Sequence, residues 1–284
     1  MKTGLVLEGG ALRGLFTAGV LDVMMEHDLT VDAVVGVSAG AVFGCNFKSC
    51  QIGRTIRYNK KYCREWRFGS FRSLLLTGDY YGADFCYRRI PEELDVFDAE
   101  TFQKTDMTFD VVCTDVDSGE PAYHRCSTAM GEDLQWMRAS ASMPLVSHPV
   151  EINGKKYLDG GIADSIPLHY MESLGYSHSI VILTQPQGFQ KEPNRLLPLM
   201  RLLLGKKHPK MIRALENRHN VYNAITKEIE EKEKAGQILV IRPEGALHIG
   251  AASHDEKELE RVYRLGRAMG EKRLKDIRSF MTEN

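Results

Sequence analysis

The sequence predicts an α/β fold built on a mostly parallel central sheet. Two apolar runs of β type, residues 3–7 and 32–37, bracket a segment, 12–27, in which apolar residues recur at helical spacing. A strand–helix–strand order this close to the N-terminus implies a parallel pair joined by a crossover helix. Apolar runs further along the chain are expected to complete the sheet.

Four further segments of the first two thirds have strand character. Residues 109–114 predict a buried strand, and a turn after it leads to an alternating return strand at 121–125. Residues 149–158 predict a hairpin whose turn is Asn153-Gly154, the dipeptide most typical of two-residue hairpin turns. Residues 179–184 predict another core strand.

The last hundred residues differ in character from the rest. In order, we expect a linker at 185–188, a helical stretch at 195–229 broken near Pro198 and at 207–209, a strand at 238–241 and a long charged helix at 256–281. We therefore expect an N-terminal α/β domain, 1–184, and a largely helical C-terminal extension, 185–284, that packs on it.

The composition is typical of a soluble globular protein. Of the 284 residues, 43% are hydrophobic and 26% charged, and the formal net charge of −1 gives no reason to expect a nucleic-acid partner. The sequence contains no run of about 18 consecutive apolar residues, so we expect no membrane-spanning segment. The N-terminus turns acidic at Glu8, too early for a signal peptide. We expect a cytoplasmic protein, with peripheral membrane contact left open.

The cysteines indicate neither disulfides nor a metal site. They form no C-x-x-C pair and follow no regular ligand spacing, so free thiols in a reducing compartment are expected. The six positions are Cys45, Cys50, Cys63, Cys86, Cys113 and Cys126. No metal, nucleotide or redox cofactor is indicated.

The pentapeptide Gly36-Val37-Ser38-Ala39-Gly40 reads G-x-S-x-G and lies between a predicted strand and a small-residue segment that can begin a helix. This context is typical of a nucleophile elbow, a sharp turn that presents a reactive serine. Gly36 and Gly40 would let the backbone bend and the helix pack close to the strand. Ser38 is therefore the candidate nucleophile.

A second glycine-containing turn, Gly9 to Gly14, follows the first strand and opens the first helix. Its free N–H groups would point toward developing negative charge, so it is a candidate oxyanion hole with Gly10 and Ala11 as donors. Arg13 can brace this loop or add positive potential. A dinucleotide-binding fingerprint is the alternative, but Ala11 occupies a glycine position of that motif and no acidic residue ends the second strand.

The base that activates Ser38 must come from elsewhere in the chain. Asp159-Gly160-Gly161 follows the predicted hairpin, and its two glycines would permit close approach to another turn. An Asx turn after a strand is the purely structural alternative. A Ser–His–Asp triad would need a histidine, but His148, His169 and His248 are each better explained as solvated or structural residues.

The three motifs follow one another along the chain as Gly9–Gly14, Gly36–Gly40 and Asp159–Gly161. In this order they resemble the signatures of the patatin-like phospholipases, and the segment 139–144 before the last one resembles that family too. The resemblance covers about residues 3–184. It implies a three-layer α/β/α sandwich and a Ser–Asp dyad without histidine, with Ser38 as nucleophile and Asp159 as proton acceptor. Gly9, Gly10, Ala11, Arg13 and Gly14 would form the oxyanion and substrate-binding loop, and Gly36, Gly40, Gly160 and Gly161 would support the motifs. Ala11 stands where the family usually has glycine, so a positive φ there would cost about 1 kcal/mol.

Members of that family are lipid acyl hydrolases, so the resemblance implies cleavage of a carboxylic ester of a phospholipid or lysophospholipid, in lipid catabolism. A short-chain esterase, a thioesterase or an acyltransferase using the same dyad is the alternative among enzymes. A non-catalytic lipid-binding or partner-binding protein is the alternative of another class, although Ser38, Asp159 and the Gly9-Gly10 turn are all present.

Two stretches are candidates for contact with an anionic membrane surface. Residues 54–72 interleave basic and aromatic side chains, and 196–204 is strongly apolar and is followed by Lys206-Lys207. For the first stretch, a single-stranded nucleic-acid groove is disfavoured by the net charge, and a solvated helix with its aromatic side chains in the core remains open. The second stretch could equally be a lid, a dimer seam or a buried helix.

Overall fold

A computed structural model describes residues 2–282 and contains one eight-stranded sheet. Its strands are β1 (Thr3–Leu7), β2 (Ala33–Val37), β3 (Thr108–Asp115), β4 (Pro121–Arg125), β5 (Val150–Ile152), β6 (Lys155–Asp159), β7 (His178–Ile182) and β8 (Ile238–Ile241). The spatial order is β5-β6-β3-β2-β1-β7-β8, with β4 paired to β3. The β3-β2-β1-β7-β8 part is parallel, whereas β4, β5 and β6 are added in antiparallel pairs.

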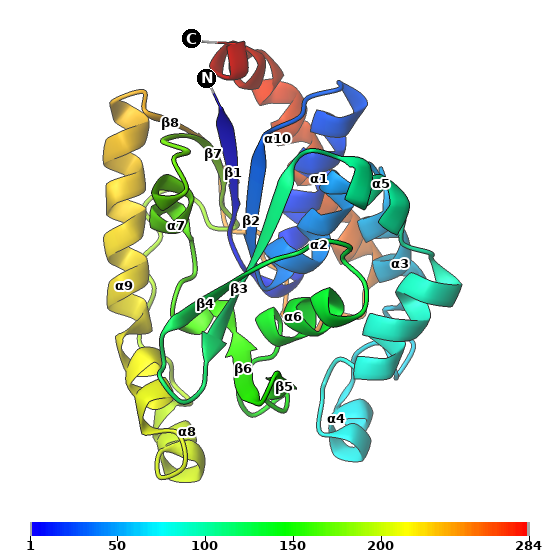
Figure 1. Ribbon diagram of the computed structural model, residues 1–284, viewed down its shortest axis with the longest axis vertical. Coiled ribbons are helices and arrows are strands. Elements are labelled where there is room, and N and C mark those ends of the chain that lie inside the picture. The colour runs from blue at the N-terminus through cyan, green and yellow to red at the C-terminus, as the bar shows by residue number, and fades with distance from the viewer. Residues whose placement is uncertain (1, 283–284) are drawn as a thin grey trace.

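Helices cover both faces of the sheet, as Figure 1 shows. They are α1 (Gly14–Glu26), α2 (Ala39–Lys48), α3 (Arg54–Tyr62), α4 (Phe71–Thr77), α5 (Ala99–Lys104), α6 (Glu132–Ser140), α7 (Leu168–Ser173), α8 (Leu197–Leu204), α9 (Pro209–Lys234) and α10 (Glu256–Thr282). Three short non-α segments complete the set: the 3₁₀ turns Ala11–Arg13 and Gly160–Ile162, and a π-helix at Phe85–Leu94.

Successive side chains of each strand point to opposite faces of the sheet, so the core is divided between the two faces. Leu5 and Leu7 pack with α1, α2 and α10, whereas Val6 packs with α7 and α9 on the other face. Parallel strands buried on both faces read as continuous apolar runs, which is why the strands were visible in the sequence. The predicted α/β fold with a helical C-terminal region is confirmed.

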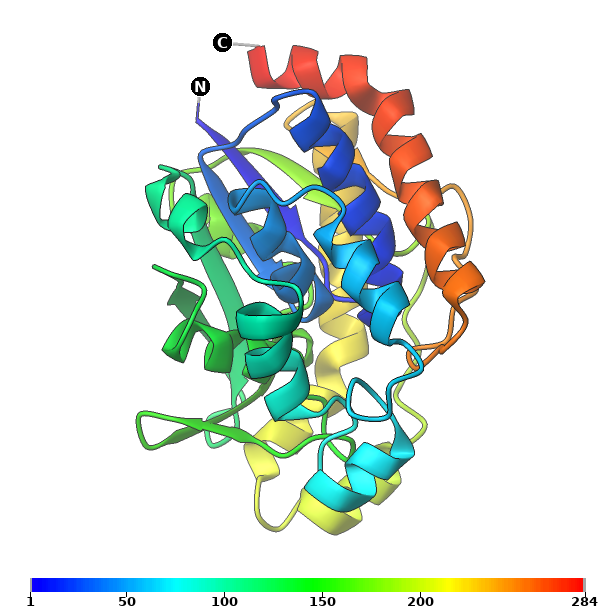
Figure 2. The same cartoon turned by 90° about the vertical axis from the view of Figure 1, so that its right-hand side faces the viewer.

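The C-terminal region is built into this architecture. Strand β8 extends the sheet by parallel pairing with β7, and α10 lies along α1, as the view in Figure 2 shows. A Cβ on Gly266 of α10 would overlap the Phe16 carbonyl oxygen, and one on Gly19 of α1 would overlap the Tyr263 carbonyl oxygen, so the two helix backbones are in contact. The division into domains at residue 184 stays a prediction.

Two details differ from what the sequence suggested. Pro198 does not break a helix: it occupies the first turn of α8, where its missing N–H leaves no hydrogen bond unmade. The Gly9–Gly14 loop enters α1 only at Gly14, after one 3₁₀ turn. Among residues 2–282, no helix is long and apolar enough to cross a membrane.

Candidate active site

Ser38 lies at the sharp turn between β2 and α2, with φ 54° and ψ −121°. A non-glycine residue in this conformation is strained, and such strain is concentrated at functional sites. The neighbouring glycines make the turn possible, because a Cβ on Gly40 would lie 2.5 Å from the Leu7 carbonyl oxygen and one on Gly36 2.6 Å from that of Gly40. The local geometry is that of a nucleophile elbow.

The Gly9–Gly14 loop lies directly against this turn. A Cβ on Gly9 would be 3.1 Å from the Ser38 Cβ, and one on Gly14 would be 2.7 Å from the Ala39 Cβ. Within the described part of the chain, the N–H groups of Gly9, Gly10 and Ala11 donate no hydrogen bond. They are thus available to an oxyanion. Ala11 has a φ of 48°, so the conformation that suits glycine is held by an alanine.

Asp159 ends β6 and is buried, with 3% of its surface exposed. One carboxylate oxygen, Oδ1, accepts the Gly161 N–H at 2.8 Å. Burial raises the pKa of Asp159, while hydrogen bonding to the Ser38 side chain and the positive charge of Arg218 act in the opposite direction. The Ser38 hydroxyl therefore faces a carboxyl group whose affinity for a proton is increased.

The segment 139–144 contacts both of these residues. The Ser140 hydroxyl accepts the Ser38 N–H at 2.8 Å and donates to the Val112 carbonyl at 2.6 Å. Two residues on, the Ser142 carbonyl accepts the Asp159 N–H at 2.8 Å. One short piece of chain at the end of α6 thus fixes Ser38 and Asp159 relative to each other.

An apolar cavity of about 320 Å³ opens beside Ser38 and Asp159. Its wall includes Ala11, so the loop, the serine and the aspartate meet at one place. Most of the lining is aliphatic and aromatic, and the part from the stretch 54–72 comprises Arg54, Tyr58, Asn59, Phe68 and Phe71. Tyr58 and Phe68 are thus buried in the cavity wall, whereas Phe71 lines the cavity and is also 76% exposed.

The cations of the same stretch are mostly occupied by partners. Arg57 forms a salt bridge with Asp95 at 2.7 Å, Lys60 with Glu260 at 2.8 Å and Arg67 with Glu65 at 2.9 Å. Arg54 is buried and donates to Asn46 and to the Asp95 carbonyl. These pairs explain the charge pattern of the stretch without a bound anion.

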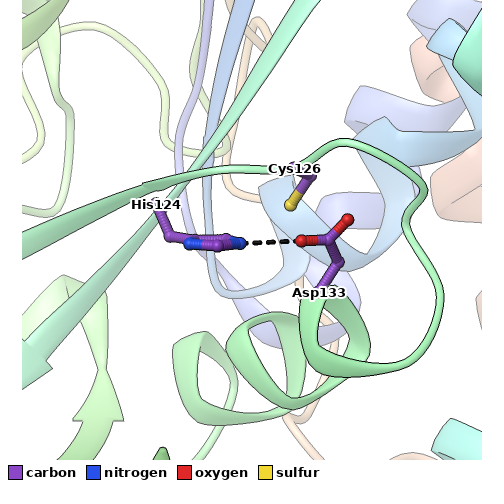
Figure 3. Close-up of side chains that lie close together, drawn as sticks. All are labelled: His124, Cys126 and Asp133. Carbon is purple, nitrogen blue, oxygen red and sulfur yellow. Dashed lines mark hydrogen bonds and ion pairs between the residues drawn. The ribbon is translucent and has the colours of Figure 1, made fainter. Parts of the chain in front are cut away.

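No histidine lines this cavity among the residues that the structure describes. Figure 3 shows the cluster of His124, Cys126 and Asp133, whose possible ligand atoms lie within 4.8 Å of one another. Asp133 accepts the N–H groups of residues 127, 128 and 129, which together with His124 hold the pKa of Asp133 at about 2 against the effect of burial. The Cys126 thiol has its pKa raised by burial. This arrangement is explained as an anchor for the loop that brings Ala129 to the cavity.

Several residues at the site were not found from the sequence. Glu8 is buried beside the Gly9-Gly10 turn and accepts hydrogen bonds from the Thr184 N–H and the Tyr222 hydroxyl. Lys191 and Arg218 approach from the C-terminal region. Glu8 directly follows an apolar run, which is a signal for a buried carboxylate, whereas nothing in the local sequence pattern predicts that Lys191 and Arg218 lie at the site.

Comparison with known proteins identifies the family. Residues 5–171 match the family model described as patatin-like phospholipase, and residues 208–282 match a domain of unknown function. The uncharacterised protein YjjU of Escherichia coli is 28% identical over 292 residues, covering 99% of this chain and 80% of YjjU. The lysophospholipase NTE1 of Meyerozyma guilliermondii is 25% identical over 284 residues, covering 93% of this chain but only 18% of that much longer protein.

Among solved structures, VipD from Legionella pneumophila aligns with a TM-score of 0.47 and 13% identity, covering 97% of this chain and 67% of VipD. The match to the family model spans the Gly9–Gly14 loop, Ser38 and Asp159 together. On the strength of that match, the chain belongs to the patatin-like phospholipase family.

Proposed function

We propose that this protein is a serine acyl hydrolase that cleaves carboxylic esters of lipids through a Ser38–Asp159 dyad. One observation carries the proposal: the Ser38 hydroxyl, on a strained turn, faces the buried Asp159 carboxyl group at the wall of an apolar cavity. Family membership supports the same class of reaction.

In the first half of the reaction, the Ser38 oxygen attacks the ester carbonyl carbon while Asp159 accepts the hydroxyl proton. The carbonyl oxygen becomes an oxyanion, which the free N–H groups of Gly10 and Ala11 can stabilise. A raised pKa suits Asp159 to this step, because a stronger base takes the proton more readily. When the tetrahedral intermediate collapses, protonated Asp159 gives its proton to the leaving alkoxide, and the acyl group remains on Ser38.

In the second half, water attacks the acyl-serine carbonyl and gives a proton to Asp159. Collapse of the second tetrahedral intermediate releases the fatty acid and returns the proton to the Ser38 oxygen. Asp159 thus alternates between base and acid, as microscopic reversibility requires, and no histidine is needed.

The cavity favours a substrate with an apolar acyl chain over a small polar ester. Its volume of about 320 Å³ is at the lower end of small-molecule sites, and its lining from Val42, Phe43, Ile90 and Met137 offers no partner for polar groups. A bound ester with a short acyl chain would leave most of this apolar wall in contact with water. Hydrolysis of p-nitrophenyl esters of increasing chain length should therefore become more efficient as the chain grows.

The enzyme class is tested with a fluorophosphonate probe, which labels activated serines. Wild-type protein should be labelled at Ser38, and Ser38→Ala should be neither labelled nor active on esters. Ser147→Ala is the matched control, because Ser147 lines the same cavity and is expected to leave labelling at Ser38 intact. Unchanged ester turnover in Ser38→Ala would reject Ser38 as the nucleophile. Absence of both turnover and labelling in the wild-type protein would reject the hydrolase assignment and leave a lipid-binding protein as the alternative.

We also propose that the end of the molecule carrying α4 and α8 contacts a lipid surface. Both helices lie at the end toward which β1 and β2 run, as Figures 1 and 2 agree. Their exposed apolar side chains are Phe71, Leu75 and Leu76 on α4, with Leu199, Leu202 and Leu203 on α8; Leu75 is 87% and Leu202 79% exposed. Phe71 also lines the cavity, and Arg72, Lys206 and Lys207 are exposed nearby. Apolar groups ringed by cations suit an anionic interface.

Co-sedimentation with vesicles containing anionic lipid tests this surface. Leu75→Glu combined with Leu202→Glu should abolish binding at low salt, because both side chains would leave water on binding. Leu265→Glu on α10 is the control, since Leu265 is 44% exposed and lies on another helix. Equal sedimentation of the double variant and wild type would exclude this surface as the docking site.

A further inference from the structure

Three cationic side chains from distant parts of the sequence lie near one another, and two of them, Lys191 and Arg218, are close enough to Asp159 to act on its charge. Arg13 lies in the Gly9–Gly14 loop, Lys191 lies in the loop after β7, and Arg218 belongs to α9. The charged groups around Lys191 are Arg13 and Arg218 of the same sign, and Glu8 and Asp159 of the opposite sign. Three cations thus share two carboxylates, which leaves an excess of positive charge.

Arg218 is held against the loop that carries Asp159. Its Nε donates to the Gly161 carbonyl, and its Nη2 lies 3.2 Å from where a Cβ of Gly161 would be. The Gly161 N–H in turn donates to the Asp159 carboxylate. The guanidinium is therefore separated from the carboxylate by a single residue, and its other N–H groups donate to no group in residues 2–282.

Lys191 is positioned by α9 through its main chain. Its N–H donates to the Asn223 side chain at 2.8 Å, and its carbonyl accepts from the same side chain at 3.1 Å. The Lys191 Nζ lies 4.2 Å from the centre of the Tyr222 ring, and the Tyr222 hydroxyl donates to Glu8 at 2.7 Å. The ammonium group therefore sits above a residue that is anchored next to the oxyanion loop.

These cations differ from others in the same region because they lack direct carboxylate partners. Within the described residues, Arg13, Lys191 and Arg218 form no salt bridge, whereas Lys232 of α9 pairs with Glu172 and Glu228. The Nε of Arg13 is buried without a hydrogen-bond partner. Partly buried donors without partners are costly, and an anion placed among them would satisfy them.

We propose that Lys191 and Arg218, together with Arg13, bind the phosphate group of an anionic lipid headgroup. This inference rests on the proposed hydrolase function, because that function sets the orientation of the substrate in the site. The leaving oxygen must lie within hydrogen-bonding reach of Asp159, so the alcohol part of the substrate continues past the Asp159–Gly161 loop. The cations lie beside that loop and outside the lining of the apolar cavity. The acyl chain and the phosphate would thus occupy opposite sides of Ser38, and the C-terminal region would supply the headgroup site.

The test measures binding of two ether-linked ligands, an alkylglycerol phosphate and the alkylglycerol with the same chain, by titration calorimetry below their micelle concentrations. Neither ligand has an ester carbonyl, so binding is read independently of turnover. Wild-type protein should bind the phosphate-bearing ligand more tightly. Lys191→Met and Arg218→Gln should each weaken that binding by about tenfold or more, a typical effect of removing a charge-assisted contact, and leave alkylglycerol binding nearly unchanged.

Matched controls separate charge from folding. Lys227→Met and Arg213→Gln remove the same charges from exposed positions of α9 and should preserve both affinities. Arg218→Lys keeps the charge and should retain most of the preference for phosphate. Competition by inorganic phosphate in wild type but not in Lys191→Met would show that the free anion suffices, and no competition would show that the phosphate is recognised only as part of the lipid.

Equal affinity of wild-type protein for the two ligands would overturn the proposal. So would equal weakening of both ligands in Lys191→Met and Arg218→Gln, because that is the signature of a structural role. Failure of the hydrolase function would be seen separately, as an absence of ester turnover and of probe labelling at Ser38.

Discussion

The Ser140 hydroxyl accepts a hydrogen bond from the backbone N–H of Ser38 at 2.8 Å and donates one to the Val112 carbonyl at 2.6 Å. Ser140 is fully buried, so neither bond competes with water. Through Ser140, the candidate nucleophile is connected to β3, and Cys113 of the same strand is paired with Asp159 of β6. The strained turn at Ser38 is therefore stabilised by a hydrogen bond to Ser140, a residue outside the turn.

We predict that Ser140→Ala lowers kcat for ester hydrolysis by about tenfold or more, because the Ser38 N–H loses its partner and the turn can relax. Stability should fall by about 1–3 kcal/mol, the cost of leaving a buried donor unpaired. Steady-state kinetics and chemical denaturation measure the two effects. Ser142→Ala is the comparison, since Asp159 is held by the Ser142 main chain and not by its side chain. Unaltered kcat in Ser140→Ala would show that the bond is dispensable for Ser38.

The pH dependence of hydrolysis should report on Asp159. Burial raises the pKa of Asp159 above its ordinary value near 3.8. The carboxylate is the form that accepts a proton, so kcat/KM should fall as pH decreases through this raised pKa, and Arg218→Gln should move the acid limb further up, because the cation opposes the shift. Rate profiles of wild type and Arg218→Gln test this. An acid limb at an unperturbed aspartate value would contradict the assignment of Asp159 as base.

The same raised pKa has a consequence for stability. A buried carboxyl group with a raised pKa costs stability while it is ionised, at pH above the folded-state pKa, and that cost disappears as pH falls and the group is protonated. Asp159→Asn should therefore abolish hydrolysis without lowering the melting temperature at neutral pH, and any gain should shrink toward acid pH. Thermal scans across pH provide the measurement. A large loss of stability at neutral pH would mean that the charge serves the fold.

The oxyanion loop offers two substitutions with opposite expectations. Ala11 has a φ of 48°, so Ala11→Gly should relieve strain of about 1 kcal/mol and keep the N–H, with turnover within about threefold of wild type. Gly10 has an extended backbone, with φ −176°, but a Cβ there would lie 2.6 Å from the Thr184 hydroxyl. Gly10→Ala should displace the loop and reduce kcat by about a hundredfold, as expected for loss of an oxyanion donor. Equal activity in both variants would rule out this loop as the oxyanion hole.

The contact between α1 and α10 should make the C-terminal helix necessary for stability. Because a Cβ on Gly266 would overlap the Phe16 carbonyl oxygen, Gly266→Ala should destabilise the protein by about 1–3 kcal/mol through overpacking. Gly245→Ala is the control, since a Cβ at Gly245 meets no atom within 4 Å. Denaturant unfolding compares the two. If Gly266→Ala is as stable as Gly245→Ala, the helix packing is looser than these contacts indicate.

Much of the fold was predictable because its signals are local. Strands β1, β2, β3 and β7 are apolar runs buried on both faces, and Asn153-Gly154 forms the predicted hairpin turn with positive φ at both residues. The serine, the oxyanion loop and the aspartate could be proposed because each stands in a short glycine-containing motif. The structure shows that these three motifs meet at one cavity.

The rest depended on contacts between distant segments. Nothing near Tyr58 or Phe68 shows that their rings face a cavity next to Ser38, because that orientation is set by the packing of α3 and the chain after it. Lys191 and Arg218 are ordinary surface-type residues in the sequence. They become part of the site only because α9 packs on the second face of the sheet and passes the Asp159–Gly161 loop, where Arg218 contacts Gly161.

The central claim is that Ser38 carries the acyl group during turnover. Rapid acid quenching of wild-type protein with a long-chain ester, followed by mass spectrometry of the peptide containing Ser38, measures this directly. We expect an added acyl mass on Ser38 in wild type and none in Ser38→Ala, which should also be inactive. Ester turnover that proceeds with no acyl adduct on Ser38, and continues in Ser38→Ala, would contradict it.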